Sequence, residues 1–124
     1  MKAIKTLLVA DDDRTLHSFY RELFDKEFEI LSAYDGAEAL MMAVAHLPDV
    51  MILDVSMPLL DGRALCSKLK KFPTTQDVKI VMVTGKTSQY DRLVGLEVGA
   101  DDYLEKPAYP QQLLKSVKSL AGHS

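Results

Sequence analysis

The sequence predicts an α/β fold, a doubly wound sandwich in which five parallel strands alternate with five helices. Short apolar runs lack the polar alternation of half-exposed strands, which is typical of strands buried on both faces of a parallel sheet. Stretches with helical spacing of apolar residues separate these runs. Strands and helices in this alternation imply right-handed crossovers and helices on both faces of the sheet. The length of 124 residues fits a single domain.

The first half of the chain contains three apolar runs that predict strands, at residues 6–10, 28–33 and 50–53. After the first run, the spacing i, i+3, i+4, i+7 and i+8 predicts an amphipathic helix whose apolar stripe comprises Leu16, Phe19, Tyr20, Leu23 and Phe24. A turn at Asp35 and Gly36 precedes a second helix, which ends at Pro48 and is expected to bury Leu40, Ala43, Val44 and Leu47.

The second half of the chain continues the alternation. The third helix ends near Pro73, and its apolar face is expected to contain Leu65, Leu69 and Phe72. Two further strands are predicted at residues 80–83 and 102–104. Between them lies a fourth helix that reaches Gly99 and carries Tyr90, Leu93, Val94 and Glu97. The fifth helix begins near Pro110, because proline is favoured in the first turn of a helix.

Composition and charge exclude several classes of function. The chain has 15 basic and 18 acidic residues and a net charge of -3, so we expect neither direct nucleic-acid binding nor attraction to an anionic membrane. The single cysteine, Cys66, cannot form an internal disulfide. The apolar run near the N-terminus is too short for a signal peptide or a membrane span. These features predict a cytoplasmic location.

Polar residues that suit phosphate chemistry follow four of the predicted strands. They are Asp11, Asp12, Asp54, Thr84 and Lys106. Because the carboxyl ends of parallel strands meet at one edge of the sheet, where ligands bind, we expect these side chains to converge. Carboxylates bind a cation, whereas a hydroxyl and an ammonium bind phosphate. The combination indicates a carboxylate that becomes phosphorylated.

Each of these residues has a structural alternative when it is considered alone. The acids at positions 11–13 could cap the helix that follows them. Asp54 could also be a helix cap, Thr84 an ordinary β-branched strand residue, and Lys106 a solvated surface charge. The argument for a site therefore rests on their joint occurrence at strand ends.

Four stretches give the chain a family resemblance, namely LLVADDD, DVMILDVSMPLLDG, IVMVTGK and GADDYLEKP. In this order and spacing, they make the chain similar to the receiver domain of two-component response regulators. The resemblance covers nearly the whole chain, so residues 1–124 are expected to form one receiver domain. It implies the strand order 2-1-3-4-5, for which a receiver is itself a standard example.

The resemblance also implies a role for each acidic residue. Asp54 matches the phosphoacceptor, whose carboxylate becomes an acyl phosphate. Asp12 matches a direct Mg²⁺ ligand and Asp11 its usually water-bridged partner, while Asp54 and the backbone carbonyl of Ser56 complete the metal site. Oxygen ligands and retained waters suit Mg²⁺, and Mn²⁺ is expected to substitute for it.

The remaining roles concern the phosphoryl oxygens and the conformational switch. Thr84 matches a hydroxyl and Lys106 an ammonium, each of which binds a phosphoryl oxygen. The peptide bond between Lys106 and Pro107 is expected to be cis. Tyr103 matches an aromatic residue whose rotamer follows the Thr84 hydroxyl, so we expect it to become less exposed on phosphorylation. The alternative for Tyr103 is a half-buried strand aromatic with a hydrated hydroxyl.

The sequence departs from the family pattern near the fifth helix and after the fourth strand. Many receivers have phenylalanine at the position of Ala108, an acidic cap at that of Tyr109, and alanine at that of Gly85. These departures leave the packing beside the fifth helix open. The positions of Ser56 and Lys86 tune the lifetime of the acyl phosphate in this family.

The leading functional hypothesis is a signalling switch rather than an enzyme with a separate substrate. A histidine kinase or histidine phosphotransfer protein would phosphorylate Asp54, and a downstream effector or output domain would bind the face formed by helix four, strand five and helix five. The chain would be a monomer or a phosphorylation-dependent dimer. A haloacid-dehalogenase-like phosphatase is an alternative, but it needs an acid two residues after the nucleophile. A receiver-like module that takes no phosphate is another.

Overall fold

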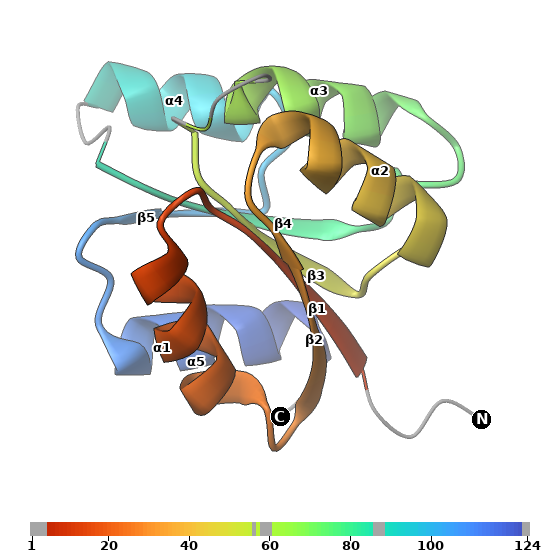
Figure 1. Ribbon diagram of the computed structural model, residues 1–124. Coiled ribbons are helices and arrows are strands. Elements are labelled where there is room, and N and C mark those ends of the chain that lie inside the picture. Colours follow the sequence, from red (N-terminus) through yellow and green to blue (C-terminus); the bar gives the residue numbers. More distant parts are fainter. Residues whose placement is uncertain (1–4, 56, 58–60, 86–88, 123–124) are drawn as a thin grey trace.

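A computed structural model describes residues 5–55, 57, 61–85 and 89–122, and these form a three-layer α/β sandwich (Figure 1). The elements in chain order are β1 (Lys5–Ala10), α1 (Arg14–Phe24), β2 (Phe28–Ala33), α2 (Gly36–His46), β3 (Val50–Leu53), α3 (Gly62–Lys71), β4 (Lys79–Thr84), α4 (Gln89–Glu97), β5 (Asp102–Glu105) and α5 (Pro110–Leu120). The strands form one parallel sheet in the order β2-β1-β3-β4-β5. The predicted fold class and strand order are confirmed.

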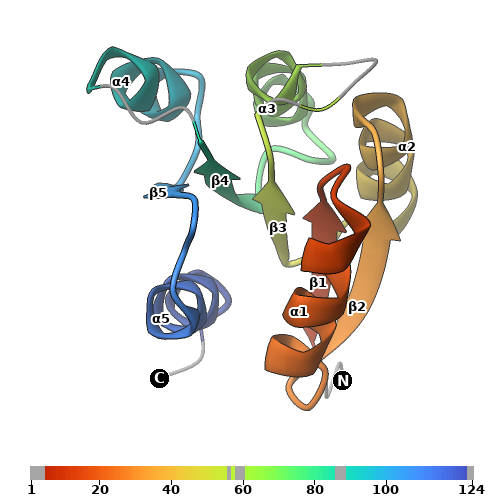
Figure 2. The same ribbon diagram turned by 60° about the vertical axis from the view of Figure 1, so that its left-hand side comes forward.

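The helices cover both faces of this sheet. Helices α1 and α5 lie on one face, and α2, α3 and α4 lie on the other (Figure 2). Each face has its own buried cluster, because alternate residues of a strand point to opposite sides of the sheet. In β3, Met51 and Leu53 join the cluster beneath α2, α3 and α4, whereas Val50 and Ile52 join the cluster beneath α1 and α5. Burial on both faces explains the unbroken apolar runs in the sequence.

The register of the sheet aligns the carboxyl ends of its central strands. Ala10, the last residue of β1, pairs with Ala33 of β2 and with Leu53 of β3. On the other side of β3, Leu53 pairs with Met82 of β4. The residues that follow these strands therefore emerge at the same edge of the sheet.

Local side-chain chemistry starts several of the helices. Asp13, Asp35 and Asp61 are N-caps, and their carboxylates accept hydrogen bonds from backbone N–H groups in the first turns of α1, α2 and α3. Such a cap stabilises a helix by about 0.5–2 kcal/mol relative to alanine. At the start of α5, the side-chain oxygen of Gln112 accepts a hydrogen bond of 3.2 Å from the N–H of Tyr109. This hydrogen bond helps to cap α5 at Tyr109, the position at which the family often has an acidic residue.

Some residues expected on buried helix faces are exposed. They are Val44, Leu47, Phe72 and Leu93, with relative exposures of 51%, 47%, 50% and 65%. In α2 the small residues Gly36, Ala39 and Ala43 are the fully buried ones, and Leu40 and Met42 are partly buried against the same cluster, whereas Met41 and Val44 are exposed. Leu47 and Phe72 fall outside their helices, as C-caps in left-handed and extended conformations. These assignments from periodicity were wrong.

None of the helices in the described part of the chain combines the length and the apolar character that crossing a bilayer requires.

Candidate functional site

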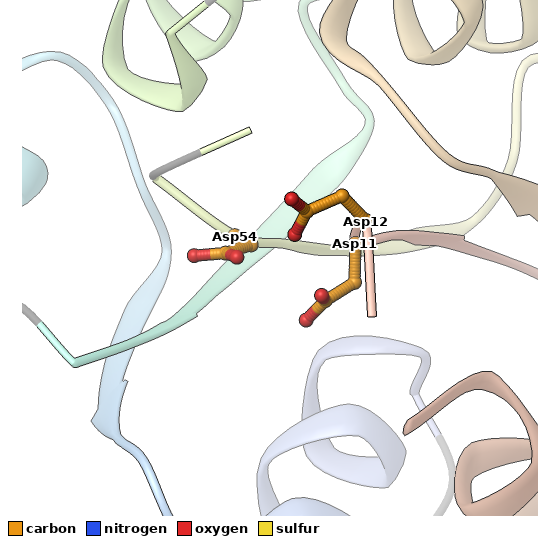
Figure 3. A group of neighbouring side chains, drawn as sticks. All are labelled: Asp11, Asp12 and Asp54. Atoms are coloured by element: carbon orange, nitrogen blue, oxygen red, sulfur yellow. The ribbon is translucent and has the colours of Figure 1, made fainter. Parts of the chain in front are cut away.

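Three carboxylates lie together at the carboxyl edge of the sheet. One oxygen from each of Asp11, Asp12 and Asp54 lies within 4.8 Å of the others (Figure 3). Asp11 and Asp54 are only 1% and 5% exposed, whereas Asp12 is exposed to solvent. The structure thus brings together the acidic residues that the sequence singled out.

Backbone hydrogen bonds that extend the sheet ladder position these acids. The N–H of Asp11 donates to the carbonyl of Ala33 at 3.1 Å, and the N–H of Asp54 donates to the carbonyl of Ala10 at 2.9 Å. The side chain of Asp11 is also held, because its Oδ1 accepts a 2.9 Å hydrogen bond from the N–H of Asp13. The close approach of the carboxylates therefore follows from the pairing of β1 with β2 and β3.

Lys106 lies between the two buried carboxylates. Its Nζ is 3.0 Å from Oδ2 of Asp11 and 3.3 Å from Oδ2 of Asp54. The backbone N–H of Lys106 donates to the carbonyl of Thr84 at 2.9 Å, which ties the end of β5 to the end of β4. The peptide bond from Lys106 to Pro107 is cis, as the resemblance implied.

The electrostatics of the site show an excess of negative charge. Burial raises the pKa of Asp11, and the charge of Asp54 adds to this effect, while the N–H of Asp13 and the ammonium of Lys106 oppose it. Burial lowers the pKa of Lys106, but its contacts with Asp11 and Asp54 outweigh that effect and the net pKa is raised. Among the described residues, the ammonium of Lys106 is thus the one positive group paired with these carboxylates, which favours an additional cation.

The three acids fit a small divalent cation. Magnesium takes oxygen ligands at about 2.0–2.1 Å in an octahedron, so its ligands lie within about 4.2 Å of one another. One oxygen from each of Asp11, Asp12 and Asp54 lies within 4.8 Å of the others, so small movements of the side chains would reach that limit, and the exposure of Asp12 leaves room for water ligands. The fourth expected ligand, the carbonyl of Ser56, lies outside the described residues, as does Lys86.

Thr84 and Tyr103 are both buried. Thr84 is the last residue of β4 and pairs with Glu105 of β5, so it lies at the same edge as the acids. Tyr103 is 1% exposed and belongs to the cluster beneath α4. The half-buried alternative is therefore excluded. The expectation that Tyr103 becomes less exposed on phosphorylation also needs correction, since the ring has no exposure left to lose.

Two glycines make close approaches that the sequence did not reveal. A Cβ at Gly62 would lie 2.5 Å from the carbonyl oxygen of Asp54, so α3 can begin against the candidate phosphoacceptor only without a side chain there. A Cβ at Gly95 in α4 would lie 2.7 Å from Cδ2 of Tyr103. Glycines in a turn and in a helix carry no sequence signal that distinguishes close approach from backbone freedom.

A further residue beside the site was missed because it resembles ordinary helix packing. His17 of α1 is buried, and its Nε2 lies 2.6 Å from the backbone carbonyl of Asp11. Histidine at a helical spacing from Tyr20 and Phe24 gives no indication of this contact.

The departure at Ala108 leaves an apolar hollow beside the site. The hollow has a volume of about 440 Å³, and its lining includes Phe19, Tyr20, Lys106 and Ala108. A larger side chain at position 108 would occupy part of this space. At the start of α5, this chain thus has Tyr109 where the family often has an acidic cap, and Ala108 with an adjacent hollow where many receivers have phenylalanine.

Comparison with known proteins agrees with the geometry. Residues 7–118 match the family model described as the response regulator receiver domain. The chain is 40% identical over 116 residues to the response regulator PleD of Caulobacter vibrioides, covering 94% of this chain and 26% of PleD. It is 41% identical over 116 residues to the transcriptional regulatory protein PrrA of Mycobacterium tuberculosis, covering 94% of this chain and 49% of PrrA. The chain thus spans half or less of these curated relatives.

A solved structure gives the same result. The receiver domain of the Francisella response regulator 1452 is 32% identical and superimposes with a TM-score of 0.88, covering 95% of this chain and 97% of that chain. The match in sequence extends over the strands that carry the acids, the threonine and the lysine, and the match in structure extends over the whole sandwich. The chain therefore belongs to the response regulator receiver domain family.

Proposed function

We propose that this chain is a phosphoaccepting receiver domain in which Asp54 takes a phosphoryl group from a histidine kinase or a histidine phosphotransfer protein. The observation that supports it most directly is the position of Lys106, whose Nζ lies within 3.3 Å of Asp54 and 3.0 Å of Asp11. An ammonium that reaches the phosphoacceptor carboxylate also reaches a phosphoryl oxygen attached to it.

The proposed reaction is an in-line displacement at phosphorus. An oxygen of Asp54 forms a bond to the phosphorus of the donor, the phosphorus–nitrogen bond of the phosphohistidine breaks, and the imidazole leaves with its electron pair. The product is an acyl phosphate on Asp54. In this scheme, the hydroxyl of Thr84 and the ammonium of Lys106 each bind a phosphoryl oxygen.

The carboxylates of Asp11, Asp12 and Asp54, with the carbonyl of Ser56, would hold Mg²⁺, and Mn²⁺ would substitute for it. When bound, the ion offsets the negative charge that accumulates during transfer. The raised pKa of Asp11 supports this role, because burial already penalises its charged form before a phosphoryl group arrives.

The output would come from a population shift at the face formed by α4, β5 and α5. We expect a downstream effector or an output domain to bind this face, with the chain acting as a monomer or as a phosphorylation-dependent dimer. Residues 1–124 would act as one receiver unit in the cytoplasm, without binding nucleic acid directly. Turnover would be limited to the phosphorylation of Asp54 and its hydrolysis.

The phosphatase alternative is weaker. It requires an acid two residues after the nucleophile, and Asp54 is followed by Val55 and Ser56. A test for turnover of p-nitrophenyl phosphate distinguishes the two functions, since a receiver should give no sustained hydrolysis of this phosphomonoester.

The direct test is incubation with acetyl phosphate and Mg²⁺, followed by intact-mass measurement and peptide mapping. We expect one phosphoryl group, on Asp54, and its loss when a chelator removes the metal. Asp54→Asn should abolish labelling. Asp35→Asn, which changes the N-cap of α2 but none of the three acids or Lys106, is the matched control and should leave labelling intact. Labelling that persists in Asp54→Asn would exclude Asp54 as the phosphoacceptor.

A further inference from the structure

His17 is a buried polar side chain that the proposed reaction does not use. It lies on α1 and is 5% exposed. Its Nε2 is 2.6 Å from the backbone carbonyl of Asp11, and a carbonyl can only accept a hydrogen bond, so Nε2 carries the proton. In the neutral ring, Nδ1 then carries a lone pair. That atom is buried and has no hydrogen-bond partner among the described residues.

The carbonyl of Asp11 belongs to the peptide that joins Asp11 to Asp12. The other polar groups of Asp11 are held by Ala33, Asp13 and Lys106. His17 supplies the remaining contact, to the carbonyl oxygen. The peptide between the first two acids of the site is therefore fixed by a side chain from the next helix.

This peptide matters because it directs the carboxylate of Asp12. Asp12 is exposed, and within the described part of the chain no hydrogen bond to its side chain orients it. Its direction toward Asp11 and Asp54 consequently depends on the backbone. A rotation of the peptide would turn the Cα–Cβ bond of Asp12 away from the other two acids.

The imidazole is itself held in place by an aromatic neighbour. The ring of Tyr34, which follows β2, packs on His17 with a centroid distance of 4.4 Å and a tilt of 48°. The guanidinium of Arg14 lies 4.0 Å from the centroid of the Tyr34 ring. The ring of His17 therefore has little freedom to leave the Asp11 carbonyl. Buried polar atoms are almost always paired, so the unpaired Nδ1 of His17 is unfavourable. This cost indicates that the hydrogen bond from Nε2 to the Asp11 carbonyl has a specific role.

We propose that His17 is a positioning residue for the metal site: its Nε2–H fixes the peptide between Asp11 and Asp12 and thereby aims the Asp12 carboxylate at the cation. This inference rests on the proposed function, because it assumes that the three acids hold Mg²⁺. Outer partners that orient metal ligands commonly change affinity by about 10- to 100-fold when they are removed.

The test compares two substitutions of similar size. His17→Leu removes the donor, and His17→Gln keeps an N–H at nearly the same reach. Mg²⁺ affinity is measured by calorimetry on the whole chain, together with the free energy of unfolding in EDTA. We expect His17→Leu to weaken Mg²⁺ binding about tenfold, and His17→Gln to recover most of that loss. Nitrogen NMR of the wild-type ring should show the Nε2–H tautomer.

Val117→Ala is the matched control, because it truncates a fully buried side chain of α5 in the cluster that also contains Tyr20 and Phe24. It should lower stability without changing Mg²⁺ affinity. If His17→Leu does not fold, His17→Asn replaces it, since its shorter amide does not reach the carbonyl.

The outcomes separate the two proposals. Wild-type Mg²⁺ affinity in His17→Leu, or equal losses in His17→Gln and His17→Leu, would overturn the role of His17 while leaving the metal site in place. No binding of Mg²⁺ to the wild-type chain would instead overturn the proposed function.

Discussion

The contact between Gly95 and Tyr103 gives a prediction whose sign depends on the amino acid at a second position. Gly95 lies inside α4, and a Cβ there would be 2.7 Å from Cδ2 and 2.8 Å from Cε2 of the Tyr103 ring. Ring atoms near the middle of a buried side chain cannot move aside without displacing the whole ring. We therefore expect Gly95→Ala to force Tyr103 out of its buried position.

The magnitude follows from two opposing effects. Alanine is favoured over glycine inside a helix by about 0.8–1 kcal/mol. Overpacking a buried site costs about 1–3 kcal/mol. The net loss in the free energy of unfolding should be about 0–2 kcal/mol. In a Tyr103→Val background the overlap with the ring disappears and Sδ of Met82 remains at 3.1 Å, at the end of a flexible side chain, so the same Gly95→Ala change should stabilise the chain by up to about 1 kcal/mol.

The assay is a double-mutant cycle from urea unfolding, followed by far-ultraviolet circular dichroism. Gly85→Ala is the control, because a Cβ at Gly85 would have no atom within 4 Å among the described residues other than its chain neighbours. The effect of Gly85→Ala on the free energy of unfolding should not depend on the residue at position 103. NMR of the Tyr103 ring should show its displacement in Gly95→Ala. A coupling energy near zero between positions 95 and 103 would refute the argument from close approach.

Three further predictions concern the acids, the lysine and the cysteine. Asp12→Ala should weaken Mg²⁺ binding by at least about tenfold. It should leave the unfolding free energy in EDTA unchanged or higher, because it relieves repulsion among the acids. If calorimetry gave the same Mg²⁺ affinity for the variant and the wild type, Asp12 would not be a metal ligand. Lys106→Ala should lower the unfolding free energy in EDTA by about 1.5–3 kcal/mol, since two buried carboxylates lose their charged partner. The variant should roughly preserve Mg²⁺ binding but reduce the beryllofluoride-induced NMR shifts in α4. Wild-type stability of this variant in EDTA would contradict that account. Burial raises the pKa of Cys66 from 9.0 to about 11, so the unfolded chain loses this proton first and stability should fall as the pH rises from 9 to about 11. Urea unfolding of Cys66→Ala, which lacks the thiol, should show a smaller decline in the unfolding free energy over that range. Parallel declines in the two proteins would show that the thiol does not contribute to the pH dependence of stability.

The sequence was sufficient to predict the sheet and the edge at which the acids meet. Parallel strands end at a common edge, so Asp11, Asp54 and Lys106 could be brought together without coordinates. The orientation of the helices was less predictable. Periodicity identifies an apolar stripe but not how far the helix is rotated, and in α2 the small residues approach the sheet while Val44 lies in solvent.

The contacts that refine the site could not be predicted, for a different reason. His17 binds a backbone carbonyl, and backbone atoms are the same at every position of a sequence. Gly62 and Gly95 matter through the absence of a side chain, and the neighbour that needs the space, Asp54 or Tyr103, belongs to another part of the fold, so that only the packing of the two segments reveals the contact. Whether such contacts form depends on differences of a few tenths of an ångström in interatomic distance, and these are set by the packing of the folded chain.

The ion pairs of Lys106 span most of the polypeptide. Lys106 and Asp11 are 95 positions apart, and Lys106 and Asp54 are 52 apart. Contacts this distant in sequence close late, because the loop between them must lose its freedom first. A nascent chain that is still on the ribosome, with β5 not yet released, would hold the acids without their ammonium. The acidic site would thus become complete only after β5 and Lys106 have left the ribosome, because until then the buried carboxylates of Asp11 and Asp54 lack their charged partner.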